Sequence, residues 1–222
     1  MAKYYNLKLI GTSHIAKESL TKVKKEIINS RPDIIAIELD NARFRSLQTK
    51  KKSIVPALKR FGIKGFILNL LGAYIEKLLS KETGITPGSE MKQAIILAEK
   101  LKIKIALIDQ PIEQTIKRLL SRITRKEKYQ FFKDLFQTVF VKKKQIRFDL
   151  NKVPTEATLK ELMEETKTKY PNVYKALVTE RDIYMGKALY KLMSTFPDKK
   201  ILAIVGAGHE NGIMGELKSM KK

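Results

Sequence analysis

The chain has 222 residues, 43% hydrophobic and 31% charged, which is ordinary for a folded globular protein and excludes wholesale disorder. It contains no cysteine, so disulfides, thiolate metal ligands and a cysteine nucleophile are excluded. The net charge of +22 would suit nucleic acid or an anionic membrane surface, but the lysines are scattered along the chain. No nucleic-acid-binding signature accompanies them, so we expect no specific nucleic-acid partner.

Four short apolar runs are predicted to form strands covered on both faces, because Ile, Leu and Val dominate them without strict alternation. Helical patterns over residues 17–29 and 90–102 lie between them, and this order implies parallel pairing with right-handed crossovers. The four runs are residues 4–10, 34–39, 103–108 and 201–205.

Two further segments are longer than a crossover requires. Residues 54–79 form an amphipathic helical pattern interrupted by glycines, and residues 111–196 are helical in pattern throughout. Within the second segment Thr124 and Glu127 have capping-box spacing, and Pro154 and Pro171 mark further helix starts. We therefore expect an α/β fold, a small mostly parallel sheet of about four or more strands wrapped by a large helical layer. Residues 1–222 would form a single domain with helical insertions at about 54–84 and 111–196.

An aromatic helix face in the second segment is expected to pack in the core, with a homodimer interface or a membrane contact as alternatives. No apolar run reaches the roughly 18 residues that predict a membrane span, and no signal peptide is recognisable, so we expect a cytoplasmic protein. The aromatic face comprises Phe131, Phe132, Leu135, Phe136, Val139 and Phe140.

The only two histidines occupy matching frames near the two ends of the chain. His14 closes Gly11-Thr12-Ser13-His14 and His209 closes Gly206-Ala207-Gly208-His209, each directly after a predicted strand. In an open parallel sheet the carboxyl ends of the strands meet at one edge, so we expect both imidazoles there, beside the acids that end the other strands. Histidine gains or loses a proton near neutrality and is the commonest metal ligand, which makes this pair the best clue to function.

Three glutamates each admit a functional and a structural interpretation. Glu38 ends a buried strand, where a carboxylate must be paired, bound to a metal or protonated, and its structural partner would be Arg43 or Arg45. Glu90 stands in a first helical turn, where a carboxylate usually stabilises the helix dipole. Glu180 falls on a helical stripe with Val173, Leu177, Tyr184 and Ala188, and its partner would be Arg181 or Arg118.

Taken together, these segments resemble the TraB/PrgY/GumN family of pheromone-shutdown-related proteins. The matching runs occur in the family's order and span nearly the whole chain. One departure is Asp109-Gln110, where the family tends to have Asp-Arg. The runs are Gly11-Thr12-Ser13-His14 with Ser19, Ile37-Glu38-Leu39-Asp40 with Arg43, Gly88-Ser89-Glu90-Met91, Asp109 with Thr115 and Arg118, Glu180-Arg181-Asp182-Ile183-Tyr184-Met185, and Val205-Gly206-Ala207-Gly208-His209 with Gly212-Ile213.

The resemblance implies a hydrolase, with a metal-dependent peptidase as its most specific form. The family is similar to the Tiki proteins and the erythromycin esterase-like hydrolases, which share paired Gly-x-x-His frames. Relatives are linked to lowering the activity of secreted peptide pheromones, and many carry a membrane-spanning C-terminal region, so a longer natural protein would be membrane-associated. Carried over by position, the implied catalytic residues are His14, Glu38, Glu90, Arg181 and His209, and the implied substrate-binding residues are Ser13, Arg43, Arg118, Glu180 and Tyr184.

Two mechanisms remain open for a hydrolase that acts on a peptide or another small molecule. In one, His14, His209 and a carboxylate, Glu38 or Glu90, bind a zinc, manganese or cobalt ion that lowers the pKa of its water to about 7, and another carboxylate is the general base. In the other, one histidine oriented by a carboxylate activates water directly, and Arg181 stabilises the oxyanion. Two other classes of function also remain: a protein that sequesters a peptide without cleaving it, and a basic module that binds an anionic membrane or nucleic acid.

Overall fold

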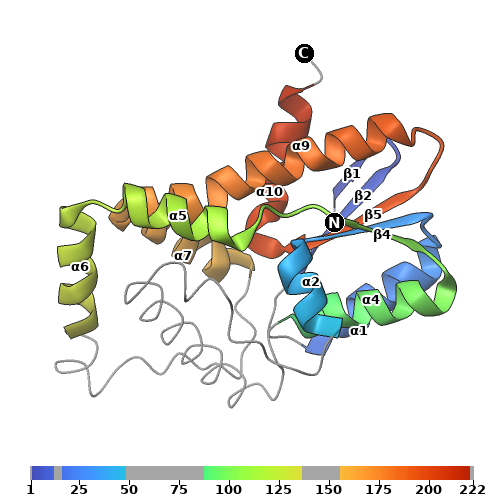
Figure 1. Ribbon diagram of the computed structural model, residues 1–222, viewed down its shortest axis with the longest axis horizontal. Coiled ribbons are helices and arrows are strands. Elements are labelled where there is room, and N and C mark those ends of the chain that lie inside the picture. The colour runs from blue at the N-terminus through green and yellow to red at the C-terminus, as the bar shows by residue number, and fades with distance from the viewer. Residues whose placement is uncertain (1, 13–16, 49–87, 137–155, 221–222) are drawn as a thin grey trace.

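The computed structural model describes residues 2–12, 17–48, 88–136 and 156–220, and these form a five-stranded sheet with helices on both faces (Figure 1). The strand order is β1-β2-β5-β3-β4, in which β1 pairs antiparallel with β2 and all other pairs are parallel. The predicted α/β class and mostly parallel sheet are therefore confirmed. The strands are β1 (Ala2–Tyr4), β2 (Leu7–Thr12), β3 (Ile34–Ile37), β4 (Lys104–Leu107) and β5 (Ile201–Gly206).

The first predicted strand is wrong in one respect, because residues 4–10 span a hairpin. Tyr5 adopts a left-handed conformation with φ of 52°, and the chain reverses between Tyr4 and Leu7, which pair across the turn. Asn6 holds this turn by donating from its side chain to the carbonyls of Phe196 and Lys199, each at 2.9 Å. The reversal was hidden in the sequence because neither glycine nor proline marks it.

The central strand β5 is buried at every position, as is β3, because helices cover both faces of the sheet. On one face pack α1 (Lys17–Ser30) and α4 (Ser89–Leu101), with Val23, Ile27, Met91 and Ile95 against Ile35 and Leu202. On the other pack α9 (Glu180–Thr195) and α10 (Ala207–Ser219), with Met185, Leu189, Ile213 and Leu217 against Leu9 and Ala203. Each such side chain contributes about 1.5–3 kcal/mol on burial, so these two layers fix the sheet on which the strand-end residues depend.

A helical layer extends beyond the carboxyl ends of the strands, and α5 and α6 project away from the sheet in Figure 1. Within the described residues, the segment predicted to be helical from 111 to 196 is helical, and the predicted capping box is confirmed. Thr124 Oγ1 accepts from the Glu127 amide at 3.2 Å, and Glu127 accepts from the Thr124 amide at 2.9 Å. The helices of this layer are α2 (Asn41–Gln48), α5 (Ile112–Arg122), α6 (Arg125–Phe136), α7 (Glu156–Lys169) and α8 (Pro171–Tyr174).

Several predictions about the helical layer fall outside the described residues. These are the amphipathic segment 54–79, the helix start at Pro154, and the aromatic face, of which the structure describes the backbone to Phe136 but not the side chains. Within the described ranges, no helix is both long enough and apolar enough to cross a bilayer.

The predicted stripe is correct for Glu180 and Ala188, whose side chains are partly buried, and wrong for Leu177 and Tyr184, which are exposed. A π-helical turn, Lys175–Thr179, joins α8 to α9, and within it the Glu180 amide bonds to the Lys175 carbonyl, five residues back. A π turn holds one residue more than an α-helical turn, so every later side chain is rotated by one position. From the buried Ala176, the inward face therefore continues to Arg181, Met185 and Leu189, while Tyr184 is 42% exposed.

Candidate active site

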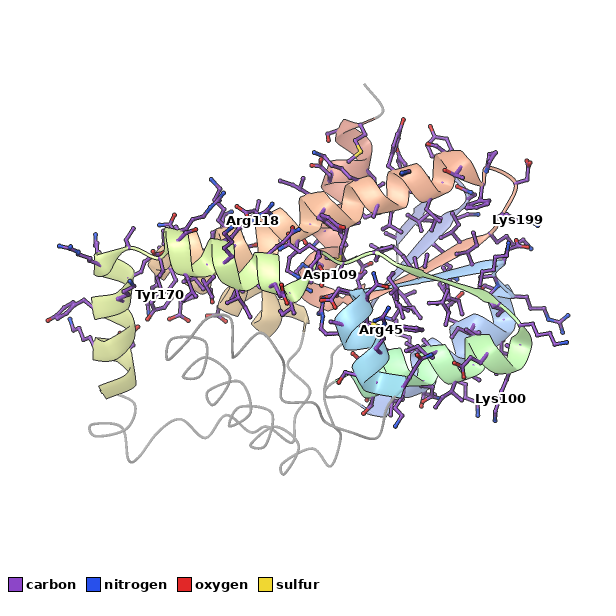
Figure 2. All side chains as sticks on the ribbon, viewed as in Figure 1. Arg45, Lys100, Asp109, Arg118, Tyr170 and Lys199 are labelled. Carbon is purple, nitrogen blue, oxygen red and sulfur yellow. The ribbon has the colours of Figure 1, made fainter. Side chains whose placement is uncertain are left out.

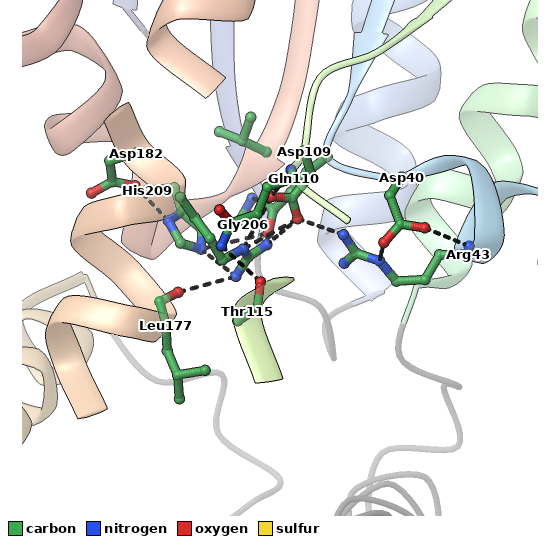
Figure 3. Close-up of polar contacts among 12 residues, drawn as sticks. Asp40, Arg43, Asp109, Gln110, Thr115, Leu177, Asp182, Gly206 and His209 are labelled. Atoms are coloured by element: carbon green, nitrogen blue, oxygen red, sulfur yellow. Dashed lines mark hydrogen bonds and ion pairs between the residues drawn. The ribbon is translucent and has the colours of Figure 1, made fainter. Parts of the chain in front are cut away.

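The carboxyl ends of the parallel strands bring Glu38, Asp109 and His209 together at one edge of the sheet, as the sequence predicted (Figure 3). Glu38 follows β3, Asp109 follows β4, and His209 lies in the first turn of α10 directly after β5. Arg181 reaches the same point from the start of α9. The edge therefore holds a compact histidine, arginine and carboxylate cluster built by four separate elements.

Arg181 is the centre of this cluster. Its Nη2 pairs with Glu38 and, at 2.6 Å, with Asp109 Oδ2, while Nε lies 3.2 Å from both oxygens of Asp109. Its Nη1 lies 3.0 Å from His209 Nε2 and 3.3 Å from the Leu177 carbonyl inside the π turn. Burial alone would lower the pKa of Arg181, but Asp109 and Glu38 outweigh it and raise that pKa, so the guanidinium stays charged.

Glu38 joins the cluster to the start of α10. One of its oxygens pairs with Arg181, and the other accepts from the Gly206 amide at 2.6 Å, where the amino end of the α10 dipole favours a carboxylate. Its side chain is only 5% exposed, so these two partners replace water. Of the two partners that the sequence suggested for Glu38, Arg43 and Arg45, Arg43 pairs with Asp40 at 3.0 Å and with Asp109 at 2.6 Å.

Asp109 is fully buried and lies between two guanidiniums. Arg181 and Arg43 both contact its Oδ2 at 2.6 Å, and its Oδ1 accepts from the Gln110 amide at 2.7 Å. Burial alone would raise the pKa of Asp109, but the hydrogen bonds and charges of Arg181 and Arg43 lower it below its ordinary value. Asp109 is therefore an anion that holds Arg181 in place.

His209 and Asp182 form a hydrogen-bonded dyad. His209 Nδ1 lies 2.6 Å from Asp182 Oδ1, and Nε2 faces Arg181 Nη1 at 3.0 Å and Glu38 Oε1 at 3.5 Å. Because arginine can only donate, Nε2 must accept there, which assigns the proton to Nδ1 and makes Asp182 its acceptor. Burial raises the pKa of Asp182, although the hydrogen bond from His209 acts the other way. A more basic carboxylate holds the Nδ1 proton, and with it the ring, more firmly.

Gly212 makes room for this dyad on the next turn of α10. A Cβ at Gly212 would overlap the carboxylate of Asp182, so only glycine permits the approach of α9 at this point. Asp182 is not among the predicted site residues. Its place in the Glu180–Met185 run shared with the family is a signal in the sequence that could have found it, whereas the π turn that brings it to the buried face becomes visible only in the structure.

The first histidine frame leaves the sheet beside the second, although Ser13 and His14 lie outside the described residues. In the parallel register of β2 and β5, Gly11 pairs with Val205 and Thr12 with Gly206. Thr12 Oγ1 donates to the Val205 carbonyl at 3.1 Å, and the Gly11 amide donates to Glu210 at 3.1 Å. The strand ends that carry the two frames are therefore neighbours, and the position of His14 itself stays a prediction.

The remaining predicted residues lie at different distances from the cluster. Glu180 pairs with Arg118 at 3.1 Å, as one alternative predicted, and also with Arg122. Glu90 is 1% exposed in the first turn of α4. Tyr184 is exposed, because the π turn directs it away from the site.

The described residues do not by themselves form the predicted metal site. No group of three or more histidine and acidic side chains arranged to hold a metal ion occurs among the residues that the structure covers. Of the predicted ligands, His209 and Glu38 already direct lone pairs at the guanidinium of Arg181, and His14 lies outside the described ranges. A metal ion bound by His209 Nε2 and Glu38 would have to replace Arg181.

The fold and the cluster define an α/β protein with a histidine, arginine and carboxylate site at the carboxyl edge of a parallel sheet. The chain belongs to the TraB/PrgY/gumN family, which matches residues 5–222. It is 38% identical over 219 residues to an uncharacterized protein of Methanocaldococcus jannaschii, covering 96% of this chain and 53% of that protein. It is 23% identical over 231 residues to a human TraB domain-containing protein, covering 92% of this chain and 61% of that one. The chain thus spans between about half and three fifths of these relatives.

Among solved structures, the chain is similar to a mutant erythromycin esterase in its open conformation. The match has a TM-score of 0.36 and 14% identity, and covers 91% of this chain and 60% of the esterase.

Proposed function

We propose that this protein is a hydrolase of ester or peptide bonds in which His209 is the general base. The observation that supports this most is the imidazole held by Asp182 on Nδ1 at 2.6 Å, with Nε2 directed at Arg181 and Glu38. A base fixed in one tautomer by a carboxylate can activate water, and a cation beside it can stabilise the oxyanion that forms. Family membership is compatible with this class of function.

The proposed step needs no group beyond this chain, water and substrate. His209 Nε2 takes a proton from water as its oxygen attacks the carbonyl carbon, and Asp182 stabilises the resulting imidazolium. Arg181 Nη1 leaves Nε2 and donates to the oxyanion that forms. His209 then gives its proton to the leaving alkoxide or amine, the bond to the leaving group breaks, and the acid product is released. Glu38 and Asp109 keep Arg181 charged and in place throughout.

The test is hydrolysis by the purified protein of a series of 4-nitrophenyl esters and of a peptide library read by mass spectrometry. His209→Ala and Asp182→Asn should each lower turnover by about two orders of magnitude or more. Asp198→Asn is the matched control, because Asp198 is an exposed aspartate in the loop before β5, at the opposite edge of the sheet. Equal activity of wild type and His209→Ala would refute the proposed role of His209.

A divalent metal ion remains a separate proposal for the same site. Metal analysis of protein purified without an affinity tag for metals, followed by chelation and refilling with zinc, manganese or cobalt, tests it. Turnover that is lost on chelation and restored by one ion would support metal binding by His14, His209 and Glu38. Turnover unaffected by chelation, in protein free of metal, would reject it in favour of direct activation by His209.

A second candidate function is a peptide-binding protein without catalysis. The observation that favours it is the saturation of Arg181, whose guanidinium is engaged by Asp109, Glu38 and His209 in the described structure. Such a network can serve as a scaffold below a binding surface. Peptides that bind but stay intact under every metal condition would support this function. A binding affinity that falls steeply with salt for anionic vesicles or nucleic acid would instead support a basic surface module.

A further inference from the structure

Two arginines on α5 form a cationic pair outside the catalytic cluster. Arg118 and Arg122 are one helical turn apart, and both contact the carboxylate of Glu180 at the start of α9. Arg118 Nη1 lies 3.1 Å from Glu180 Oε2, and Arg122 Nη1 pairs with the other oxygen. Two positive charges thus share one negative charge, which leaves the group with a net charge of about +1.

The carboxylate of this group is mostly buried, whereas the two arginine side chains are partly exposed to solvent. The Glu180 side chain is 11% exposed, whereas those of Arg118 and Arg122 are 44% and 38% exposed. Within the described contacts both guanidiniums use only Nη1, so their Nε–H and Nη2–H groups remain available. Glu180 therefore holds two arginine side chains in fixed positions while their outer donors stay unpaired, so little side-chain freedom is lost when a ligand binds.

The pair is connected to the proposed catalytic cluster by buried polar contacts. Arg118 Nη1 also donates to Gln110 Oε1 at 3.2 Å, and the Gln110 amide donates to Asp109 at 2.7 Å. Gln110 is fully buried, and its side-chain amide donates to Thr115 at 2.7 Å, which fixes its orientation. Figure 2 shows Arg118 on α5 and Asp109 near the start of that helix. A ligand held by the pair would thus lie beside the site at which hydrolysis is proposed.

We infer that Arg118 and Arg122 bind an oxyanion, a carboxylate or phosphate group, carried by the substrate. Guanidinium donors match the planar oxygens of a carboxylate and those of phosphate, and such charge-assisted bonds are about twice as strong as neutral ones. A nearby unneutralised carboxylate on the protein would oppose this, but Glu180 already pairs with both arginines, and Asp109 pairs with Arg43 and Arg181. The term substrate rests on the proposed hydrolase function, whereas oxyanion binding does not.

The test measures binding of three probes by calorimetry at low salt: inorganic phosphate, a tripeptide with a free carboxyl terminus, and the same tripeptide as its carboxyl-terminal amide. We expect phosphate or the free acid to bind, and the amide to bind at least about tenfold more weakly than the acid, since a hydrogen bond to a charged group contributes about 1.5–3 kcal/mol. Binding of the free acid would identify the oxyanion as a carboxylate. Binding of phosphate alone would identify it as a phosphate.

Three variants separate this site from general attraction to a basic protein. Arg122→Gln should weaken binding of the successful probe about tenfold or more, and Arg122→Lys should restore part of the loss because it keeps the charge but not the planar donors. Arg31→Gln is the matched control, since Arg31 is an exposed arginine before β3, at the opposite edge of the sheet. The inference is overturned if no probe binds, or if Arg122→Gln and Arg31→Gln bind equally well.

The same variants distinguish failure of this inference from failure of the proposed function. If oxyanions bind but no ester or peptide is cleaved, the binding site stands and the hydrolase proposal fails. If hydrolysis occurs and Arg122→Gln has unchanged KM for both acidic and neutral substrates, the catalytic proposal stands and this inference fails. A rise in KM for acidic substrates alone, with kcat unchanged, supports both.

Discussion

Replacing Arg181 with methionine should strongly destabilise the fold. The Arg181 side chain is 16% exposed and pairs with Glu38 and Asp109, whose side chains are 5% and 0% exposed. Methionine keeps most of the aliphatic volume, so the main effect is two buried carboxylates that lose their shared cation. Removing one partner of a buried ion pair costs about 3–5 kcal/mol, and we expect the free energy of unfolding to fall by about that amount at pH 7.

Arg122→Met provides the comparison for this prediction. Arg122 is 38% exposed, and Glu180 keeps Arg118 when Arg122 is lost, so the expected cost is about 0–1 kcal/mol. The assay is urea unfolding followed by far-ultraviolet circular dichroism, because the chain has no tryptophan. Equal losses of stability in the two variants would refute the conclusion that Arg181 neutralises buried charge.

The cost of Arg181→Met should also depend on pH. Arg181 and Arg43 lower the pKa of Asp109 in the folded protein, so the stability it contributes is present above its unfolded pKa of about 3.9 and lost as the pH falls below that. Without Arg181, the effect of burial on Asp109 is opposed mainly by Arg43, so the pKa of Asp109 should rise in the variant. Protonation of Asp109 would then remove the unpaired buried charge, and the difference in free energy of unfolding between wild type and variant should become smaller as the pH falls toward 4. A difference that does not change with pH would contradict the conclusion that Arg181 lowers the pKa of Asp109.

Four further predictions concern how the site is held. Asp182→Asn should move the His209 proton from Nδ1 toward Nε2. Nitrogen chemical shifts of the imidazole would show this in a His14→Ala background, where His209 is the one histidine. Unchanged shifts would contradict the hydrogen bond between His209 and Asp182. Deleting Val178 should restore α-helical spacing and rotate Arg181 by about 100°, so the far-ultraviolet spectrum should persist while the wild-type nitrogen shifts of His209 are lost. Gly212→Ala should lower the free energy of unfolding by about 1–3 kcal/mol in urea, because the added Cβ forces Asp182 to move. An unchanged free energy of unfolding would show that α9 and α10 can move apart without cost. Thr124→Ala should lower the free energy of unfolding by about 1 kcal/mol, because it removes one of the two hydrogen bonds of the capping box. Melting followed by calorimetry measures this, and an unchanged melting temperature would contradict it.

Much of the architecture could be predicted from the sequence because it depends on local patterns. Unbroken runs of Ile, Leu and Val identified the buried parallel strands, and the intervening helical patterns required crossovers between them. Parallel strands end at one edge, so Glu38, Asp109 and His209 could be expected together without coordinates. The hairpin at Tyr5 escaped because its left-handed conformation is held by the distant carbonyls of Phe196 and Lys199.

Which partner each site residue takes could not be predicted, because these contacts join residues far apart in the chain. Arg181 lies 143 positions from Glu38 and 72 from Asp109, so no spacing rule favours it over the nearby Arg43. Helical periodicity selected Tyr184 for the inward face, but the π turn directs Arg181 and Met185 inward and leaves Tyr184 exposed. Packing of α9 against α10 and β5 brings Arg181 and Asp182 to His209, where buried charges must be matched in three dimensions. The residue types and the edge they share are thus set locally, whereas their pairing is set by long-range packing of one helix against the sheet.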